Sequence, residues 1–180
     1  EVVLYEMDLD AGRLRPADLP AVELHGGAGP RHFDVHPSEE YAYLINELDS
    51  TVTAFGRDTE TGALDAIETE STLPAEFDGQ NKTADIHVHP SGDWVYGSNR
   101  GHDSIAVFAV DDAGGIDRQA VVSTGGEWPR NFGMDPGGEY LFAENRDTDD
   151  ITTFAIDDGG DIAENGAVAD VPQPISMVFL

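Results

Sequence analysis

The chain has 180 residues, of which 36 are acidic and 9 are basic, and its formal net charge at pH 7 is −27. It has no cysteine, which excludes disulfides and thiol catalysis. So acidic a composition argues against nucleic acid or an anionic membrane as a partner, because phosphate groups are bound by basic surfaces. With no 18-residue apolar run and no signal segment, we expect a cytoplasmic location.

The acidic residues are spread along the chain rather than gathered in one tail, and Lys82 is the only lysine. Such a surface suits a protein that must stay soluble in concentrated salt, where screening weakens the repulsion between like charges. We therefore expect a salt-loving source organism.

Residues 1–28 are predicted to form a partial sheet unit. Tyr5 to Gly12 aligns with Phe55 to Gly62 of the following unit, so this segment corresponds to the outer half of that unit. The matching inner half is missing from this segment. We expect an outer pair of strands here.

Three repeats follow, at residues 29–82, 83–127 and 128–173. Asn46, Asn99 and Asn145 stand in register, with offsets of 53 and 46 residues. Each repeat reads as strand, turn, strand, polar loop, strand, hairpin and strand, with β-branched and aromatic residues in the strands and Gly, Pro and Asp in the turns. A period of about 45 residues made only of strand-like pieces is typical of a β-propeller blade. We predict an all-β fold of four-stranded antiparallel blades.

Residues 174–180 look like a lone inner strand that closes a ring. Together the repeats and the two ends amount to about half of a propeller, with three full blades and partial blades at the two ends of a single domain, 1–180. The unpaired backbone groups of an exposed edge strand can hydrogen-bond to a strand of another chain. We expect the chain to be part of a longer protein, or to complete its ring by associating with the missing half or with itself.

The repeats help to separate scaffold from site. A residue that all three repeats share, such as Asn46 and its equivalents, is interpreted as structural, because an Asn at a strand end ties its loop through side-chain hydrogen bonds. His36 and His89 are interpreted as turn residues. His87 and His89 share a strand face, but no third ligand follows at metal-binding spacing, so we predict no metal site.

Different polar residues at equivalent inward positions indicate a site. At the start of the expected inner strand the repeats carry His32, Asp85 and Asn131, one residue after Arg31, Ala84 and Arg130. The residues that follow the repeated Asn, including Glu47 and Arg100, fall on the same face. Several of the eight arginines therefore converge on one rim of the channel. Guanidinium groups bind carboxylate or phosphate in a forked geometry, which favours a pocket for a small anionic molecule. The alternative is that each Arg merely pairs with a neighbouring carboxylate.

These segments resemble the lactonase family of seven-bladed propellers, which includes bacterial 6-phosphogluconolactonases and fungal 3-carboxy-cis,cis-muconate lactonizing enzymes. The resemblance covers essentially the whole chain and corresponds to the C-terminal half of such proteins. The motifs that carry it are GPRH (29–32), YAYLINEL (41–48), ADIH (84–87), SNRG (98–101), DSI (103–105) and PR (129–130).

The resemblance implies a metal-independent site without a cofactor. Its catalytic residues would be His32, Asp85 and Arg130, with Arg100 and Glu47 nearby. From the resemblance and the repeats together, we predict that the substrate is bound by Arg31, Glu47, His87, Arg100 and Asn131. For a lactone, His32 or Asp85 would act as the general base and the arginines would hold the substrate anion and the developing oxyanion. We expect hydrolysis of a sugar-acid lactone such as 6-phosphogluconolactone.

Three alternatives stay open. One is a lactonizing cycloisomerase, although Asp85 is shorter than the Glu expected in that branch. Another is a propeller that binds a ligand or protein without turnover, since a fold does not fix a function. The third is a metal-dependent lactonase of a different propeller family, in which Glu47, Asp85 and Asn131 would supply part of a metal set.

Overall fold

The computed structural model describes residues 1–179, and all regular elements in that range are β-strands. A hairpin is followed by three four-stranded antiparallel sheets. The strands are β1 (Tyr5–Asp8), β2 (Arg13–Pro16), β3 (Pro30–Val35), β4 (Tyr41–Asn46), β5 (Thr51–Arg57), β6 (Leu64–Ser71), β7 (Lys82–Val88), β8 (Trp94–Arg100), β9 (Ser104–Val110), β10 (Ile116–Ser123), β11 (Pro129–Met134), β12 (Tyr140–Asn145), β13 (Asp150–Ile156) and β14 (Ile162–Asp170). In the described range, no helix is long and apolar enough to span a membrane.

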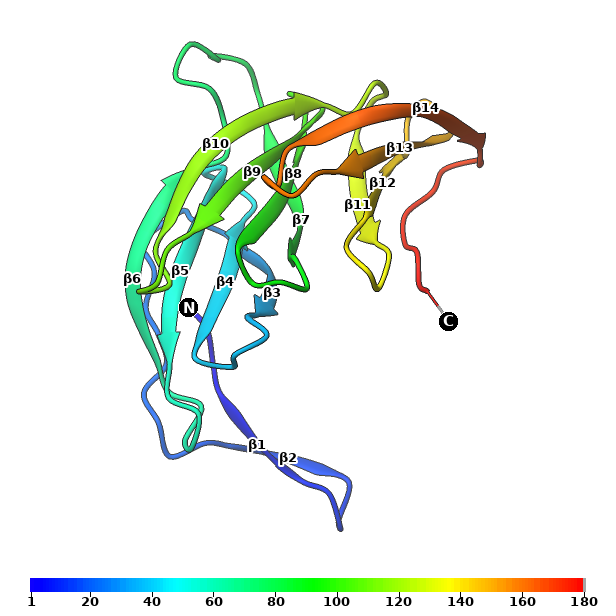
Figure 1. The fold of residues 1–180 in the computed structure, drawn as a ribbon. Coiled ribbons are helices and arrows are strands. Elements are labelled where there is room, and N and C mark those ends of the chain that lie inside the picture. Colours follow the sequence, from blue (N-terminus) through cyan, green and yellow to red (C-terminus); the bar gives the residue numbers. More distant parts are fainter. Residues whose placement is uncertain (180) are drawn as a thin grey trace.

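The three sheets stand side by side in an arc, each with its strands in sequence order (Figure 1). The first strand of each sheet, β3, β7 or β11, lies on the inner side of the arc, and β7 contacts both of the others. The last strands, β6, β10 and β14, lie on the outer side. This arrangement confirms the predicted all-β fold of antiparallel blades, and it brings the starts of three inner strands together.

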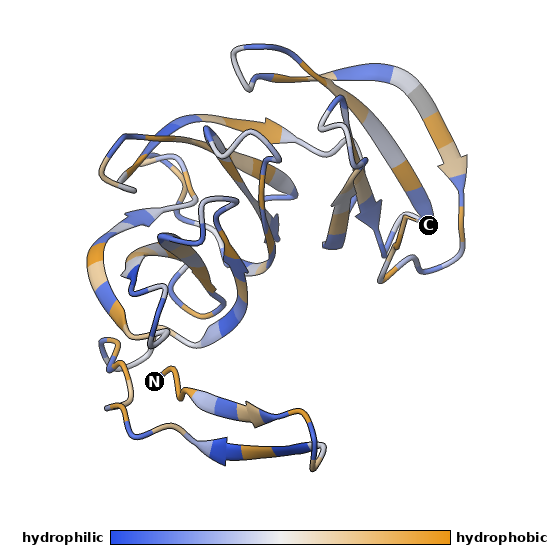
Figure 2. Cartoon of the chain, turned by 60° about the horizontal axis from the view of Figure 1, so that its bottom comes forward, coloured by the Kyte–Doolittle hydropathy of each residue, from blue (hydrophilic) through white to orange (hydrophobic). Residues whose placement is uncertain are grey.

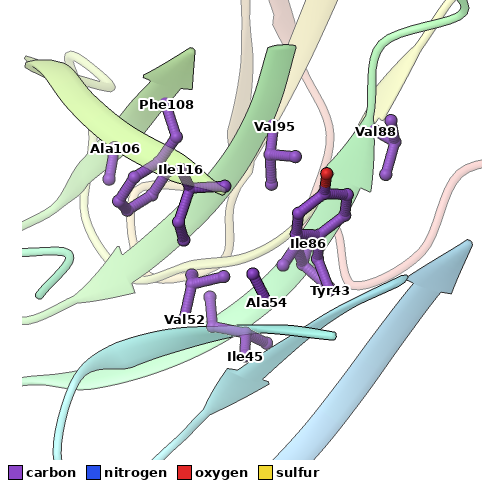
Figure 3. Packing of buried hydrophobic residues seen from close by; sticks show 10 residues of the cluster. All are labelled: Tyr43, Ile45, Val52, Ala54, Ile86, Val88, Val95, Ala106, Phe108 and Ile116. Atoms are coloured by element: carbon purple, nitrogen blue, oxygen red, sulfur yellow. The ribbon is translucent and has the colours of Figure 1, made fainter. Parts of the chain in front are cut away.

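The blades are held together by apolar side chains that alternate along the strands. Ala106 and Phe108 of β9 belong to the cluster between the first and second sheets, together with Tyr43, Ile45, Val52 and Ala54 (Figure 3). Ile105 and Val107, which point to the other face of β9, pack against the third sheet. Because successive side chains of a strand point to opposite faces, a strand buried on both faces reads as a continuous apolar run.

The N-terminal segment forms the expected pair of strands, whereas the C-terminal segment, as far as residue 179, forms no strand. The N-terminal hairpin forms, with Tyr5 opposite Pro16, and stands apart from the sheets with both strands largely exposed (Figure 2). Residues 174–179 form no strand in this structure, and the closing strand expected at residues 174–180 stays a prediction. Residue 180 lies outside the described range. A strand needs a backbone partner, and this segment makes side-chain contacts instead, such as the packing of Phe179 on Phe142.

The repeated asparagines are structural, as expected, although they bond to more than backbone. Asn46 donates to the hydroxyls of Thr51 and Thr53. Asn99 donates to the carbonyl oxygen of Thr72 and to Ser104 Oγ, and it is fully buried. These bonds fix the loop after each second strand, and that loop forms one edge of the candidate site.

Candidate active site

A β-bulge interrupts each inner strand at the residues that the sequence singled out. The pairing register shifts between Pro30 and His32 in β3, between Thr83 and Ile86 in β7, and between Pro129 and Asn131 in β11. The residues skipped by the pairing include Arg31, Asp85 and Arg130. A bulge turns a side chain away from the regular alternation, so the backbone presents Arg31 and Arg130 next to their site neighbours His32 and Asn131.

Asp85 is the hub of the site. One carboxylate oxygen, Oδ1, lies 2.5 Å from His32 Nδ1, and Oδ2 lies 3.2 Å from His87 Nε2 and accepts a hydrogen bond from the side-chain amide of Asn131. The Asp85 side chain is 5% exposed, whereas that of His32 is 42% exposed. Burial raises the pKa of Asp85, but the hydrogen bonds from His32 and His87 outweigh it and hold the pKa well below its usual range.

His87 is the second histidine on Asp85, and it lies on the same strand, β7. Its Nδ1 is 3.9 Å from Asp34 on β3, and its ring packs edge-on against Phe132 on β11, so the three inner strands meet at this side chain. Burial lowers the pKa of His87, but the hydrogen bond and charge of Asp85 reverse the effect, so the net shift is upward.

Two arginines flank one carboxylate next to this pair. Arg31 donates from Nη1 to the carbonyl oxygen of Ala84 at 2.6 Å, and the same nitrogen is 2.9 Å from His32 Nε2. Arg100 donates from Nη2 to Glu47 Oε1 at 2.7 Å and to the carbonyl oxygen of Thr83 at 2.6 Å. Glu47 Oε2 is 3.9 Å from Arg31 Nε. The alternative, that each Arg pairs with a neighbouring carboxylate, therefore describes Arg100 and in part Arg31.

Arg130 differs from these two arginines. It is partly buried and close enough to Arg31 for its positive charge to lower the pKa of Arg31, after the larger effects of burial and Arg100. Within the described residues, Arg130 makes no hydrogen bond or ion pair. In a chain with 36 acidic residues, an unpaired arginine beside another arginine is a group that an anion can bind.

The structure thus links seven of the eight predicted site residues in one connected set of contacts, and Arg130 lies close enough to Arg31 for their charges to interact. Sequence reasoning missed Glu144 of β12, which stands opposite Asn131 and is 1% exposed. Both Glu144 carboxylate oxygens lack a hydrogen-bond partner among the described residues, and burial followed by the charge of Asp85 raises the pKa of Glu144 to about 7. One signal was present: the equivalent residues before the repeated Asn are Ile45 and Ser98, so a charged residue is out of place there.

The part of the chain that the structure describes contains no group of three or more His, Cys, Asp or Glu side chains arranged to hold a metal ion. The polar groups of the eight predicted site residues are two carboxylates, two imidazoles, one amide and three guanidinium groups. Such a set can move a proton through His32 and stabilise negative charge through the arginines.

The model of one protein family, described as lactonase, 7-bladed beta-propeller, matches residues 1–179. The chain belongs to the lactonase family of seven-bladed β-propellers. The resemblance seen in the sequence is thereby confirmed.

Relatives within the lactonase family carry informative names. The chain is 43% identical to a 6-phosphogluconolactonase of Bacillus subtilis over 113 residues, which are 61% of this chain and 32% of the relative. It is 36% identical to a 6-phosphogluconolactonase of Serratia proteamaculans over 73% of this chain and 40% of that protein. The chain therefore spans well under half of the length of these curated relatives.

Solved structures agree with this lactonase-family fold. A protein from Lactobacillus plantarum superimposes with a TM-score of 0.91 at 33% identity, over 96% of this chain and 50% of that one. The periplasmic gluconolactonase of Pseudomonas aeruginosa superimposes with a TM-score of 0.88 at 30% identity, over 96% of this chain and 48% of that one. The described residues thus correspond to about half of each longer chain.

Proposed function

We propose that this lactonase-family chain carries the catalytic rim of a metal-independent hydrolase that opens a sugar-acid lactone such as 6-phosphogluconolactone. Family membership and the names of the relatives support the reaction class. The observation that carries the proposal is the position of Arg130, an arginine without a partner in the described range: it directly precedes Asn131, which donates to Asp85 of the His32–Asp85 pair, and it lies close to Arg31.

His32 is the better general base of the two candidates that the sequence left open. Asp85 is buried, accepts several hydrogen bonds and has a pKa held low, so it is a weak proton acceptor near neutral pH. It accepts from Nδ1–H of His32, which fixes the tautomer and leaves Nε2 as the basic nitrogen. His32 is also the more exposed partner and is therefore open to a water molecule.

In the proposed reaction, His32 Nε2 takes a proton from water while the water oxygen attacks the lactone carbonyl carbon. For this step Nε2 must exchange its contact with Arg31 for the water, which frees Arg31 to face the substrate. Arg31 and Arg130 then stabilise the oxyanion. When the tetrahedral intermediate collapses, the ring C–O bond breaks and the leaving oxygen receives the proton from the His32 imidazolium, which gives the open hydroxy acid.

The remaining residues have supporting roles in this proposal. Asn131 and His87 hold Asp85 in place through their hydrogen bonds. Glu47 holds Arg100 and lies near Arg31. Burial raises the pKa of Glu47, but the hydrogen bond and the charge of Arg100 outweigh it, so the pKa is lowered.

The proposal is tested by hydrolysis of 6-phosphogluconolactone, gluconolactone and carboxymuconolactone in high salt, with and without a chelator. We expect turnover of one lactone above its spontaneous rate, unchanged by the chelator. Activity that disappears with the chelator and returns with added metal would contradict metal independence. No turnover of any lactone would contradict the reaction class and favour a ligand-binding propeller.

A further inference from the structure

Trp128 occupies a backbone position that suits glycine. It stands directly before Pro129, as Gly29 stands before Pro30 in the first repeat, and both residues have positive φ angles, 60° for Trp128 and 70° for Gly29. The backbone is equivalent at the two positions, because the carbonyl oxygen of Gly29 accepts from Glu47 N and that of Trp128 accepts from Arg146 N. A bulky side chain with positive φ is strained, and such strain is concentrated at functional sites.

The indole of Trp128 adjoins the arginine cluster. Its ring centroid is 5.5 Å from the guanidinium carbon of Arg100 and 5.3 Å from that of Arg146. Its backbone N–H is held by Asp103 Oδ1 at 2.9 Å. The indole N–H is buried and has no hydrogen-bond partner in the described range. Strain and an unpaired donor both cost stability, so folding alone does not explain this tryptophan.

A pocket of about 550 Å³ opens beside this tryptophan, at the loop end of the first two blades. Trp128 and Arg100 form part of its wall, together with Lys82, Asn81 and Gln80. Lys82, the only lysine of the chain, is exposed, and within the described residues its side-chain ammonium makes no hydrogen bond or ion pair. It pairs in register with Arg100 in the sheet, so the pocket continues from the rim that holds Glu47 and Arg31.

We propose that this pocket, bounded by Trp128 and Lys82, is the subsite for the end of the substrate that lies away from the lactone carbonyl, and that it takes a sugar-acid chain with a phosphate at that end. The inference rests on the proposed function. The ammonium of Lys82 supplies a charge for phosphate, the side-chain amides of Asn81 and Gln80 offer partners for hydroxyl groups, and Trp128 closes the wall.

Fluorescence tests the subsite without needing turnover. The chain has two tryptophans, Trp94 and Trp128, and Trp94 lies away from the site against Gly160, so Trp94→Phe leaves Trp128 as the only indole in the chain. We expect 6-phosphogluconate to change the emission of this variant in a saturable way, at lower concentration than gluconate does. Lys82→Gln should weaken the binding of 6-phosphogluconate roughly tenfold, which is the order of one charge-assisted contact. The binding of gluconate should weaken less. Arg15→Gln removes an equal charge from the N-terminal hairpin and should change neither affinity.

Trp128→Gly separates a binding role from a structural one, because glycine accepts the positive φ. We expect this variant to keep the melting temperature of the parent protein and to raise KM for the lactone more than it changes kcat. A lower melting temperature with an unchanged KM would overturn the proposal. Lactone hydrolysis without any saturable fluorescence response would also overturn it and leave the proposed function standing. Saturable binding without hydrolysis of any lactone would contradict the proposed function and leave the subsite standing.

Discussion

Asp85 and Glu144 are two buried carboxyl groups that influence each other, and their pKa values move in opposite directions. His32 and His87 hold Asp85 in its ionised form against the effect of burial. Glu144 has no such partner in the described range, and burial together with the charge of Asp85 favours its protonated form. Two acids with diverging pKa values in one place are a pattern typical of enzyme sites.

Glu144→Gln is expected to stabilise the protein in a pH-dependent way. The folded-state pKa of Glu144, about 7, lies above the usual 4.5, so the carboxyl favours folding at acid pH and opposes it as pH rises through that interval. The amide cannot ionise. The gain in unfolding free energy of Glu144→Gln over the parent protein should therefore grow between about pH 4.5 and pH 7 and level off above it. Chemical denaturation at several pH values measures this gain, and a gain that does not change with pH would contradict the shift.

At the residue scale, comparison of the repeats picked out most of the residues that lie together at the candidate site, but not Glu144 or Trp128. His32, Asp85 and Asn131 were found because equivalent positions carried different polar side chains. The sequence did not indicate a role for Trp128, because that role follows from the backbone φ angle and the contacts of the ring. Neither can be predicted from residue types. Glu144 stands out in the sequence because the equivalent positions carry Ile45 and Ser98. Only the structure shows that its carboxylate oxygens are buried without a hydrogen-bond partner in the described range.

At the scale of the elements, the blades are linked through the loop that follows each second strand. Asn99 joins the connection between β6 and β7 to the end of β8, because its side chain bonds to Thr72, Asn81 and Ser104 through four hydrogen bonds. Within the described residues, the side chain of Asn46 bonds only to Thr51 and Thr53 of its own sheet, and both hydroxyls have other partners.

Asn99→Ala should therefore cost more stability than Asn46→Ala, although both residues occupy the same repeat position. We expect a loss of about 2–4 kcal/mol for Asn99→Ala, because the carbonyl oxygen of Thr72 and other polar groups are left buried with fewer partners. For Asn46→Ala we expect about 1 kcal/mol. Urea unfolding of the two variants measures the difference. Equal losses would show that the contact between blades adds nothing.

The order of the strands and turns within each blade could be predicted, because the alternation of side chains along a strand and the residues of a turn are local features of the sequence. The three bulges could not, since a skipped residue in the pairing depends on the neighbouring strand. The expected strand at residues 174–180 was assigned by analogy with the other repeats, but residues 174–179 lack the neighbouring backbone that a strand requires.

For the molecule as a whole, the net charge of −27 sets the response to salt. Repulsion among the acidic residues opposes the compact state, and the Debye length falls from about 10 Å at 0.1 M salt to about 3 Å at 1 M. We expect the melting temperature to rise with potassium chloride by about 2–4 °C for each kcal/mol of repulsion removed. An uncharged osmolyte should not reproduce the early part of this rise. A melting temperature that is independent of salt would contradict the expectation of a salt-adapted protein.

The central claim is that the His32–Asp85 pair, set beside the arginines, hydrolyses a lactone. The most direct test compares the hydrolysis of 6-phosphogluconolactone by the parent protein and by His32→Ala in high salt, with His36→Ala as a control that removes a turn histidine after the far end of β3. We predict a loss in kcat of at least about a hundredfold for His32→Ala, the order expected for a general base, and no loss for the control. Full activity of a folded His32→Ala variant would contradict the account.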